Sequence, residues 1–154
     1  MDPHLVLASR RDTVRLGGRI AAALRAGDLV LLCGELGAGK TFLARAVMRA
    51  LGIAGDLAVA SPSFAIVHDY ETAQGEVVHA DFYRLLDGPT PLDVEIGRLG
   101  LRERRRSGAI LLAEWAEDGE QALGGEAELV VTLGIHGAHA RQAVLRGARA
   151  GQVA

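Results

Sequence analysis

The pattern of hydrophobic and polar residues along the chain predicts helices that alternate with short strands. Apolar residues recur at helical spacing over residues 10–25, and a compact apolar strand follows over residues 28–33. A second apolar run, over residues 109–114, is typical of a buried central strand and ends in a carboxylate. Residues 128–135 and 140–146 predict two closing strands around a turn. This alternation predicts an α/β fold.

One segment interrupts the alternation. Strands are expected over residues 65–70 and 77–81 with a turn between them, which predicts an antiparallel hairpin inserted into a mixed, mostly parallel central sheet. Residues 94–106 predict one helix or two short helices broken at glycines. We interpret the whole chain, residues 1–154, as a single domain, and we expect residues 148–154 to fray.

The stretch between the first strand and the next helix carries the strongest motif. Gly34–Thr41 fits the P-loop pattern, Gly-x4-Gly-Lys-Ser/Thr, at every defined position. The strand before it and a helix to about Leu51 after it are the context that this motif needs. Its glycines allow several N–H groups to point at phosphate oxygens. Lys40 is placed to reach the outer phosphates and Thr41 to offer its hydroxyl to Mg²⁺, so we predict a three-layer P-loop NTPase.

Composition sharpens this prediction. The chain has 16 arginines and one lysine, and that lysine is Lys40, a compact ammonium that a planar guanidinium does not replace among phosphates. The formal net charge of −2 gives no basic field for holding nucleic acid. Cys33 is the only cysteine, which fits a reducing cytosol and a small buried strand residue. With no apolar run of ~18 residues and no secretion signal pattern, we expect a cytoplasmic protein without membrane contact.

Two acidic residues compete for the metal. Glu114 ends the apolar run over residues 109–114, and P-loop proteins place an acid at the tip of such a strand to hold Mg²⁺. An ordinary strand-end acid is the alternative interpretation. Asp81 ends its own strand, and both acids can serve one site because Mg²⁺ takes few protein ligands. We interpret His79 as a satisfied strand residue, and His136 and His139 as loop residues without zinc.

Several smaller features stay open. Arg104–Arg106 is either a solvated helix end or a docking patch for RNA or a protein partner. Arg84 is the nearest candidate for an arginine finger, with a structural ion pair as the alternative, and no residue stands out clearly in that role. The candidate segments for contact with the adenine of a bound nucleotide are Ser9–Arg10 and the Gly137–Ala138 turn.

Taken in order, four motifs resemble one family. These are Gly34–Thr41, then Ser61-Pro62-Ser63-Phe64, then His79-Ala80-Asp81-Phe82-Tyr83-Arg84-Leu85, then Glu114-Trp115. Their order and spacing are similar to TsaE, the small P-loop ATPase needed for threonylcarbamoyladenosine on tRNA beside the anticodon. The resemblance covers about residues 9–147. It implies partner proteins TsaB and TsaD, contact with tRNA only through their complex, and an ATP cycle that supports turnover of that complex.

The resemblance also implies roles for individual residues. Thr41 and Glu114 would hold Mg²⁺, Asp81 would be required for hydrolysis, and Ser61 and Ser63 would sit in a switch-like loop near the γ-phosphate. Lys40, Asp81 and Glu114 form the expected catalytic set. The expected nucleotide-binding set is Glu35, Gly37, Ala38, Gly39, Lys40, Thr41, Phe42, Ser63 and Trp115, with Trp115 beside the nucleotide-sensing region.

Three departures and two rival functions complete the picture. Phe42 replaces a second threonine, Ser63 replaces the threonine of Ser-Pro-Thr, and Ala116 replaces a proline, but none of these changes removes a phosphate or metal group. A small-molecule P-loop kinase would add a mobile arginine lid, which only residues 98–106 resemble. A guanine-nucleotide switch needs Asn/Thr-Lys-x-Asp, which a chain whose one lysine is Lys40 cannot contain.

Overall fold

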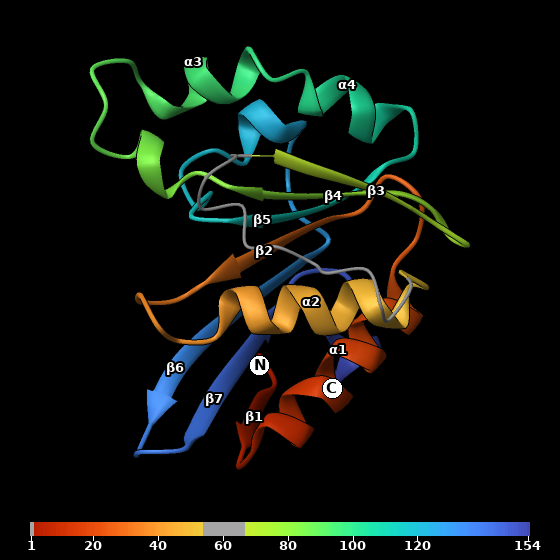
Figure 1. The fold of residues 1–154 in the computed structure, drawn as a ribbon, viewed down its shortest axis with the longest axis vertical. Helices are drawn as coiled ribbons and strands as arrows, with labels where there is room; N and C mark the ends of the chain where they lie inside the picture. The colour runs from red at the N-terminus through yellow and green to blue at the C-terminus, as the bar shows by residue number, and fades with distance from the viewer. Residues whose placement is uncertain (1, 54–66) are drawn as a thin grey trace.

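The computed structural model describes residues 2–53 and 67–154. Within them, seven strands form one sheet in the order β1-β7-β6-β2-β5-β4-β3 (Figure 1). The strands are β1 (His4–Leu7), β2 (Leu29–Cys33), β3 (Val67–Thr72), β4 (Gly75–Asp81), β5 (Ile110–Glu114), β6 (Leu129–His136) and β7 (Ala140–Arg146). The P-loop strand β2 therefore lies at the centre of the sheet.

Strand direction agrees with the expected mixed sheet. Strands β4, β5, β2 and β6 are neighbours that pair in parallel. Strand β3 is antiparallel to β4, which forms the predicted hairpin, and β7 is antiparallel to β6. Strand β1 is antiparallel to β7 and so again runs in the direction of the central strands. The carboxyl ends of the parallel strands share one edge, where α/β proteins bind ligands.

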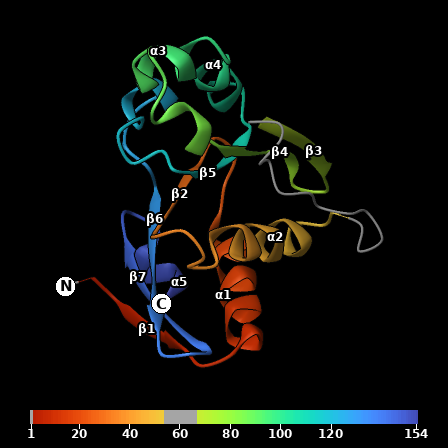
Figure 2. The ribbon, with the colours of Figure 1, turned by 60° about the vertical axis from the view of Figure 1, so that its left-hand side comes forward.

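Helices cover both faces of the sheet, as the views in Figures 1 and 2 show. One face carries α1 (Arg10–Ala23), α2 (Lys40–Ala50) and α5 (Ala150–Val153) over a buried cluster that includes Val30, Leu112 and Val131. The other face carries α3 (Leu92–Gly97), α4 (Leu101–Arg106) and the 3-10 turns η1 (Tyr83–Leu85) and η2 (Gln121–Leu123) over a second cluster. The three-layer prediction is confirmed, and α3 and α4 are the expected pair of short helices.

The C-terminal segment differs from expectation, because it does not fray. Residues 150–153 form the helical turn α5, which packs against α1 with Val153 fully buried. Arg149 pairs with Asp28, with Nε 3.0 Å from Oδ2, and its N–H donates to the carbonyl of Glu128 at 2.9 Å. These contacts fix a segment whose composition of glycine, alanine and arginine predicts no packing.

The N-terminal region contains one strand that the sequence pattern does not predict. Strand β1 is not predicted, since its four residues give no clear alternation, and it forms by pairing along β7. Helix α1 is capped by Ser9, whose Oγ accepts a hydrogen bond from the N–H of Asp12 at 3.3 Å. Val14 lies half exposed, because the buried face of α1 is centred on Leu16, Gly17 and Ile20.

No helix among the described residues is both long and apolar enough to cross a bilayer.

Candidate nucleotide-binding site

The loop between β2 and α2 follows a path that favours glycine. Gly34, Gly37 and Gly39 have φ angles of 141°, 84° and 103°, in the left-handed region that side chains disfavour. A Cβ atom on Gly34 would also lie 2.4 Å from the carbonyl oxygen of Leu133 in β6. The first helical bond of α2 runs from Leu43 N to Gly39 O at 2.9 Å, so the preceding N–H groups lack acceptors within the helix. This helix start is therefore suited to bind an anion.

Lys40 is buried at the mouth of this loop and is 5% exposed. Its ammonium donates to the carbonyl of Gly34, and also to that of Glu35 at 3.3 Å. The same nitrogen lies 3.6 Å from the ring centroid of Trp115. Burial lowers the pKa of Lys40, and the carboxylates of Glu114, Glu117 and Asp81 oppose that shift. The structure thus holds a cation between main-chain carbonyls and an indole ring.

Trp115 owes this position to an unusual backbone. Its φ is 60°, the only positive φ at a non-glycine position in the described part of the chain. Such a conformation at a bulky residue costs of the order of 1 kcal/mol and is frequently found at functional sites. The indole ring also packs against Tyr83, with centroids 5.0 Å apart and an interplanar angle of 57°. The end of β5 is therefore shaped to place an aromatic ring over the loop lysine.

Thr41 and Glu114 meet across the gap between α2 and β5. The hydroxyl of Thr41 lies 2.8 Å from Oε1 and 2.9 Å from Oε2 of Glu114. Glu114 is 2% exposed, and Oε2 also lies 2.6 Å from Nε2 of His79. His79 is fully buried in β4. The interpretation of His79 as a satisfied strand residue holds for Nε2 only, because Nδ1 has no hydrogen-bond partner in the described structure.

Asp81 lies beside this group, because it is the cross-strand partner of Glu114 in the β4–β5 pair. Its Oδ1 accepts a hydrogen bond from the N–H of Tyr83 at 2.9 Å. Burial raises the pKa of Asp81 and the charge of Glu114 adds to this, whereas the N–H of Tyr83 opposes it. The two acids that compete in the sequence therefore share one edge of the sheet, next to the loop.

The donor atoms suit a hard cation that arrives with a nucleotide. Among the described residues there is no group of three or more His, Cys, Asp or Glu side chains that could hold a metal by themselves. Thr41 and Glu114 nevertheless present a hydroxyl and a carboxylate next to the glycine loop. Mg²⁺ is commonly bound in this way, by one or two protein oxygens together with water and substrate phosphates. The residues present fit Mg²⁺.

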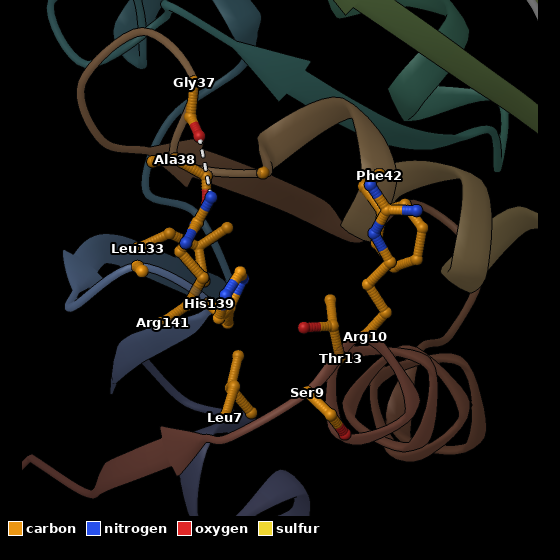
Figure 3. Close-up of a pocket in the computed structure, with 12 residues that line it drawn as sticks. Leu7, Ser9, Arg10, Thr13, Gly37, Ala38, Phe42, Leu133, His139 and Arg141 are labelled. Carbon is orange, nitrogen blue, oxygen red and sulfur yellow. Dashed lines mark hydrogen bonds between the residues drawn. The ribbon is translucent and has the colours of Figure 1, made fainter.

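A pocket of about 320 Å³ opens on the other side of the loop (Figure 3). It lies between the loop, the start of α1 and the turn between β6 and β7. The predicted adenine-side candidates Ser9, Arg10 and Ala138 all line it. Its full lining is Leu7, Ser9, Arg10, Thr13, Gly37, Ala38, Gly39, Phe42, Leu133, Ala138, His139 and Arg141. The guanidinium of Arg10 lies 5.7 Å from the ring centroid of Phe42.

Arg141 and His139 line this pocket although the sequence pattern does not predict a place for them there. Arg141 in β7 donates from Nε to the carbonyl of Ala38 at 3.2 Å, and from its terminal nitrogen to that of Gly37 at 3.4 Å (Figure 3). His139 points into the same space (Figure 3). Strand alternation gives the face on which Arg141 lies, but no local signal links it to a loop 103 residues earlier in the chain.

The structure brings most of the predicted site residues together. Lys40, Thr41, Asp81, Glu114 and Trp115 surround the loop mouth. Phe42 lies in the first turn of α2 and lines the pocket, whereas the side chain of Glu35 is exposed. Ser61 and Ser63, together with the rest of the predicted switch-like loop, lie outside the described residues.

Two of the three arginines at positions 104–106 form ion pairs with other segments of the fold. Arg104 pairs with Asp69 and Glu76 of the hairpin, each with a nitrogen–oxygen distance of 2.8 Å. Arg105 donates to Glu128 at 2.9 Å and 3.0 Å and also to four main-chain carbonyls. Of the three side chains, only that of Arg106 is exposed. The structure thus differs from a fully solvated helix end at Arg104 and Arg105, whereas Arg106 agrees with that interpretation.

Comparisons with known proteins agree with the family resemblance of the four motifs. A family model described as "Threonylcarbamoyl adenosine biosynthesis protein TsaE" matches residues 7–143. Two relatives carry the name tRNA threonylcarbamoyladenosine biosynthesis protein TsaE. The Aquifex aeolicus protein is 41% identical over 54% of this chain and 63% of its own length. The Streptomyces coelicolor protein is 44% identical over 66% of this chain and 66% of its own length.

The chain thus spans slightly under two thirds of the length of these curated relatives. Rickettsia bellii has a relative of the same name that is 33% identical over 76% of each chain. Among solved structures, Bacillus subtilis YdiB superposes with a TM-score of 0.70, covering 99% of this chain and 93% of its own. Its sequence identity of 24% supports the shared fold alone.

Proposed function

Since the chain belongs to the TsaE family, we propose that it is a Mg²⁺-dependent ATPase that supports formation of threonylcarbamoyladenosine next to the tRNA anticodon. One observation carries the proposal. The hydroxyl of Thr41, in the first turn after the glycine loop, is hydrogen-bonded to a carboxylate at the tip of a neighbouring parallel strand. In P-loop NTPases these two positions hold the metal that accompanies the nucleotide.

The proposed roles follow from where each group lies. Lys40 and the N–H groups of residues 37–42 bind the phosphates, and Thr41 and Glu114 hold Mg²⁺. When bound, Mg²⁺ neutralises charge on the phosphates. Asp81 orients, or accepts a proton from, the water that attacks the γ-phosphoryl group in line. Catalysis of this kind is mostly positioning and charge stabilisation. The proposed binding set also includes Glu35, Phe42, Ser63 and Trp115.

We propose that the adenine base binds in the pocket on the opposite side of the loop. Ser9 and Arg10 from the start of α1 and Ala138 from the β6–β7 turn face the loop across it. A volume of about 320 Å³ lies in the range of small-molecule sites. Adenine would therefore lie on the β6–β7 side of β2, and the γ-phosphate on the β4–β5 side.

The proposed partners are TsaB and TsaD, with tRNA reached only through their complex, in the cytoplasm. The relatives are named as threonylcarbamoyladenosine biosynthesis proteins, which supports a place beside such partners. The sequence offers no clear arginine finger, so we expect slow hydrolysis by the chain alone and faster hydrolysis with the partners. A small-molecule kinase receives no support, because Arg104 and Arg105 in its candidate lid are bound to the body of the fold.

Steady-state hydrolysis of ATP, with and without TsaB and TsaD, tests this function. We expect Mg²⁺-dependent release of phosphate that the partners accelerate, ATP preferred over GTP in competition, and loss of activity in Lys40→Ala. Equal and fast rates with and without the partners would oppose partner dependence. Undiminished binding and cleavage in Lys40→Ala would contradict the proposed site, and transfer of phosphate to a small alcohol or acid would favour a kinase.

A further inference from the structure

His79 is a polar residue at this site to which the proposed function gives no task. It lies in β4, two residues before Asp81, with no exposed surface. Its imidazole contacts the carboxylate of Glu114, with Nε2 2.6 Å from Oε2. Burying an imidazole costs free energy unless its polar atoms are paired, yet Nδ1 has no partner in the described structure. Within that structure, the contact with Glu114 is therefore the interaction that compensates this burial.

The chemistry of the pair fixes which atom donates. An ionised carboxylate only accepts hydrogen bonds, so Nε2 of His79 must carry the proton in this contact. We assign the tautomer from this hydrogen bond. Glu114 Oε2 thus receives an N–H from β4, while the hydroxyl of Thr41 reaches both carboxylate oxygens from α2. Two groups on different elements determine how the carboxylate is turned.

The hydroxyl of Thr41 and the N–H of His79 would have different roles once Mg²⁺ is bound. A hydroxyl that coordinates a cation directs its oxygen lone pair to the metal, so Thr41 has a second task. The N–H of His79 has no other acceptor in the described structure. Partners of this kind orient metal-binding carboxylates, and their removal commonly lowers metal affinity by about 10–100-fold.

We propose that His79 is a positioning residue, which holds the Glu114 carboxylate in the orientation needed to bind Mg²⁺ beside Thr41. This inference rests on the proposed function, because it requires that Glu114 receive the metal. His79 itself contacts neither the metal nor the nucleotide. Its effect is transmitted through Glu114, so it belongs to the Mg²⁺-dependent part of nucleotide binding and not to the part that the loop supplies.

A matched set of substitutions separates this role from simple packing. His79→Leu removes the donor while keeping a buried side chain of similar size. His79→Gln places an amide N–H at about the reach of Nε2, whereas the shorter His79→Asn does not reach Glu114. Trp115 is the one tryptophan of the chain and lies against Lys40, so its emission reports binding of ADP or ATP in EDTA and in titrations with Mg²⁺.

We expect His79→Leu and His79→Asn to raise the Mg²⁺ concentration for half-saturation by about 10-fold or more. Their nucleotide affinity in EDTA should stay that of the parent. His79→Gln should restore most of the Mg²⁺ response. In a Glu114→Gln background, His79→Leu should add no further loss, because the group that it positions is already altered. Should His79→Leu not fold, the comparison of His79→Gln with His79→Asn decides the same question.

Three results would overturn the inference. An unchanged Mg²⁺ titration in His79→Leu or His79→Asn would show that the contact is dispensable. An equal loss in EDTA and in Mg²⁺ would indicate a structural role alone, as would equal losses in the Gln and Asn variants. If the parent protein itself shows no Mg²⁺-dependent nucleotide binding, the proposed function fails and this inference fails with it. If the parent protein shows Mg²⁺-dependent nucleotide binding and His79→Leu shows the same Mg²⁺ titration, the inference about His79 is wrong while the proposed function stands.

Discussion

The ammonium of Lys40 lies 3.6 Å from the ring centroid of Trp115, while it donates to the carbonyls of Gly34 and Glu35. The lysine proposed to bind the phosphates is thus held by the loop's own main chain and by one indole. A triphosphate has to draw it away from at least part of this arrangement. Because Trp115 is the single tryptophan of the chain, its fluorescence should follow that exchange.

The first prediction concerns this pair. Addition of ATP with Mg²⁺ should change the emission of Trp115, since the charge next to the ring is drawn towards the phosphates. Lys40→Met keeps the apolar stem and removes the charge, so its emission without nucleotide should already differ from that of the parent. The variant should then respond little to ATP. Matching spectra for the two proteins, together with equal responses to ATP, would contradict the proposed movement of Lys40.

The second prediction concerns the hydroxyl at position 41. Thr41→Val preserves the shape of the side chain but removes the oxygen that lies 2.8 Å from Glu114. We expect Mg²⁺-dependent ATP hydrolysis to fall by about 10–100-fold, whereas Thr41→Ser should retain most of it. Phosphate release at several Mg²⁺ concentrations measures both. A Val variant as active as the Ser variant would show that this oxygen is not a metal ligand.

The third prediction concerns Asp81, whose pKa is raised above its usual value of 3.8 by burial and by Glu114. The folded protein therefore binds this proton more tightly than the unfolded chain. The ionised carboxylate lowers stability above the folded pKa, and this penalty vanishes below the unfolded value. In the absence of Mg²⁺, Asp81→Asn should be more stable than the parent at pH 7, and the difference should shrink as the pH falls towards 4.

The same variant separates stability from chemistry. The side-chain amide of Asp81→Asn can still accept the hydrogen bond from the N–H of Tyr83, so the local backbone should be kept. Hydrolysis should nevertheless drop by roughly 10²-fold or more, the usual contribution of a positioned base, with little change in ATP affinity. Thermal melting over a pH series tests the predicted stability of Asp81→Asn, and single-turnover hydrolysis tests its predicted loss of activity. Full activity would exclude Asp81 from the catalytic step.

The fourth prediction concerns Arg105, whose side chain is 10% exposed and links α4 to the segment before β6. Arg105→Ala removes the guanidinium donor from several carbonyls and from Glu128, which keeps only the N–H of Leu29, so the free energy of unfolding should fall by about 2–4 kcal/mol. Arg105→Lys should not rescue it, because an ammonium lacks the planar fork. Arg106→Ala, at an exposed position, should change stability by less than about 0.5 kcal/mol. Urea unfolding compares the three.

Much of this site is predictable because its parts are local. Gly34–Thr41 is a contiguous motif between a strand and a helix, and the strand that ends at Glu114 is apolar up to that residue. Each can be recognised within about ten residues of sequence. Parallel strands then bring their ends to the same edge of the sheet, which explains why Asp81 and Glu114 lie side by side.

The remaining contacts are not predictable, because they join segments far apart in sequence. His79 is bound by a residue 35 positions later, and Arg141 reaches a loop 103 positions earlier. Hydrophobic periodicity gives the face of a strand but not the polar partner that lies there. The fraying expected of the C-terminal tail is wrong for the same reason, since its burial depends on α1 and on Asp28 and not on its own composition.

Gly34 has a consequence for how this protein can vary. A methyl group there would collide with the backbone of β6, so no rotamer change or neighbouring side-chain substitution can make room for it. Glu35 and Leu36 stand next to it with exposed side chains. Leu36 has room for other side chains because it projects into solvent, whereas the backbone of β6 leaves position 34 no space for anything larger than glycine.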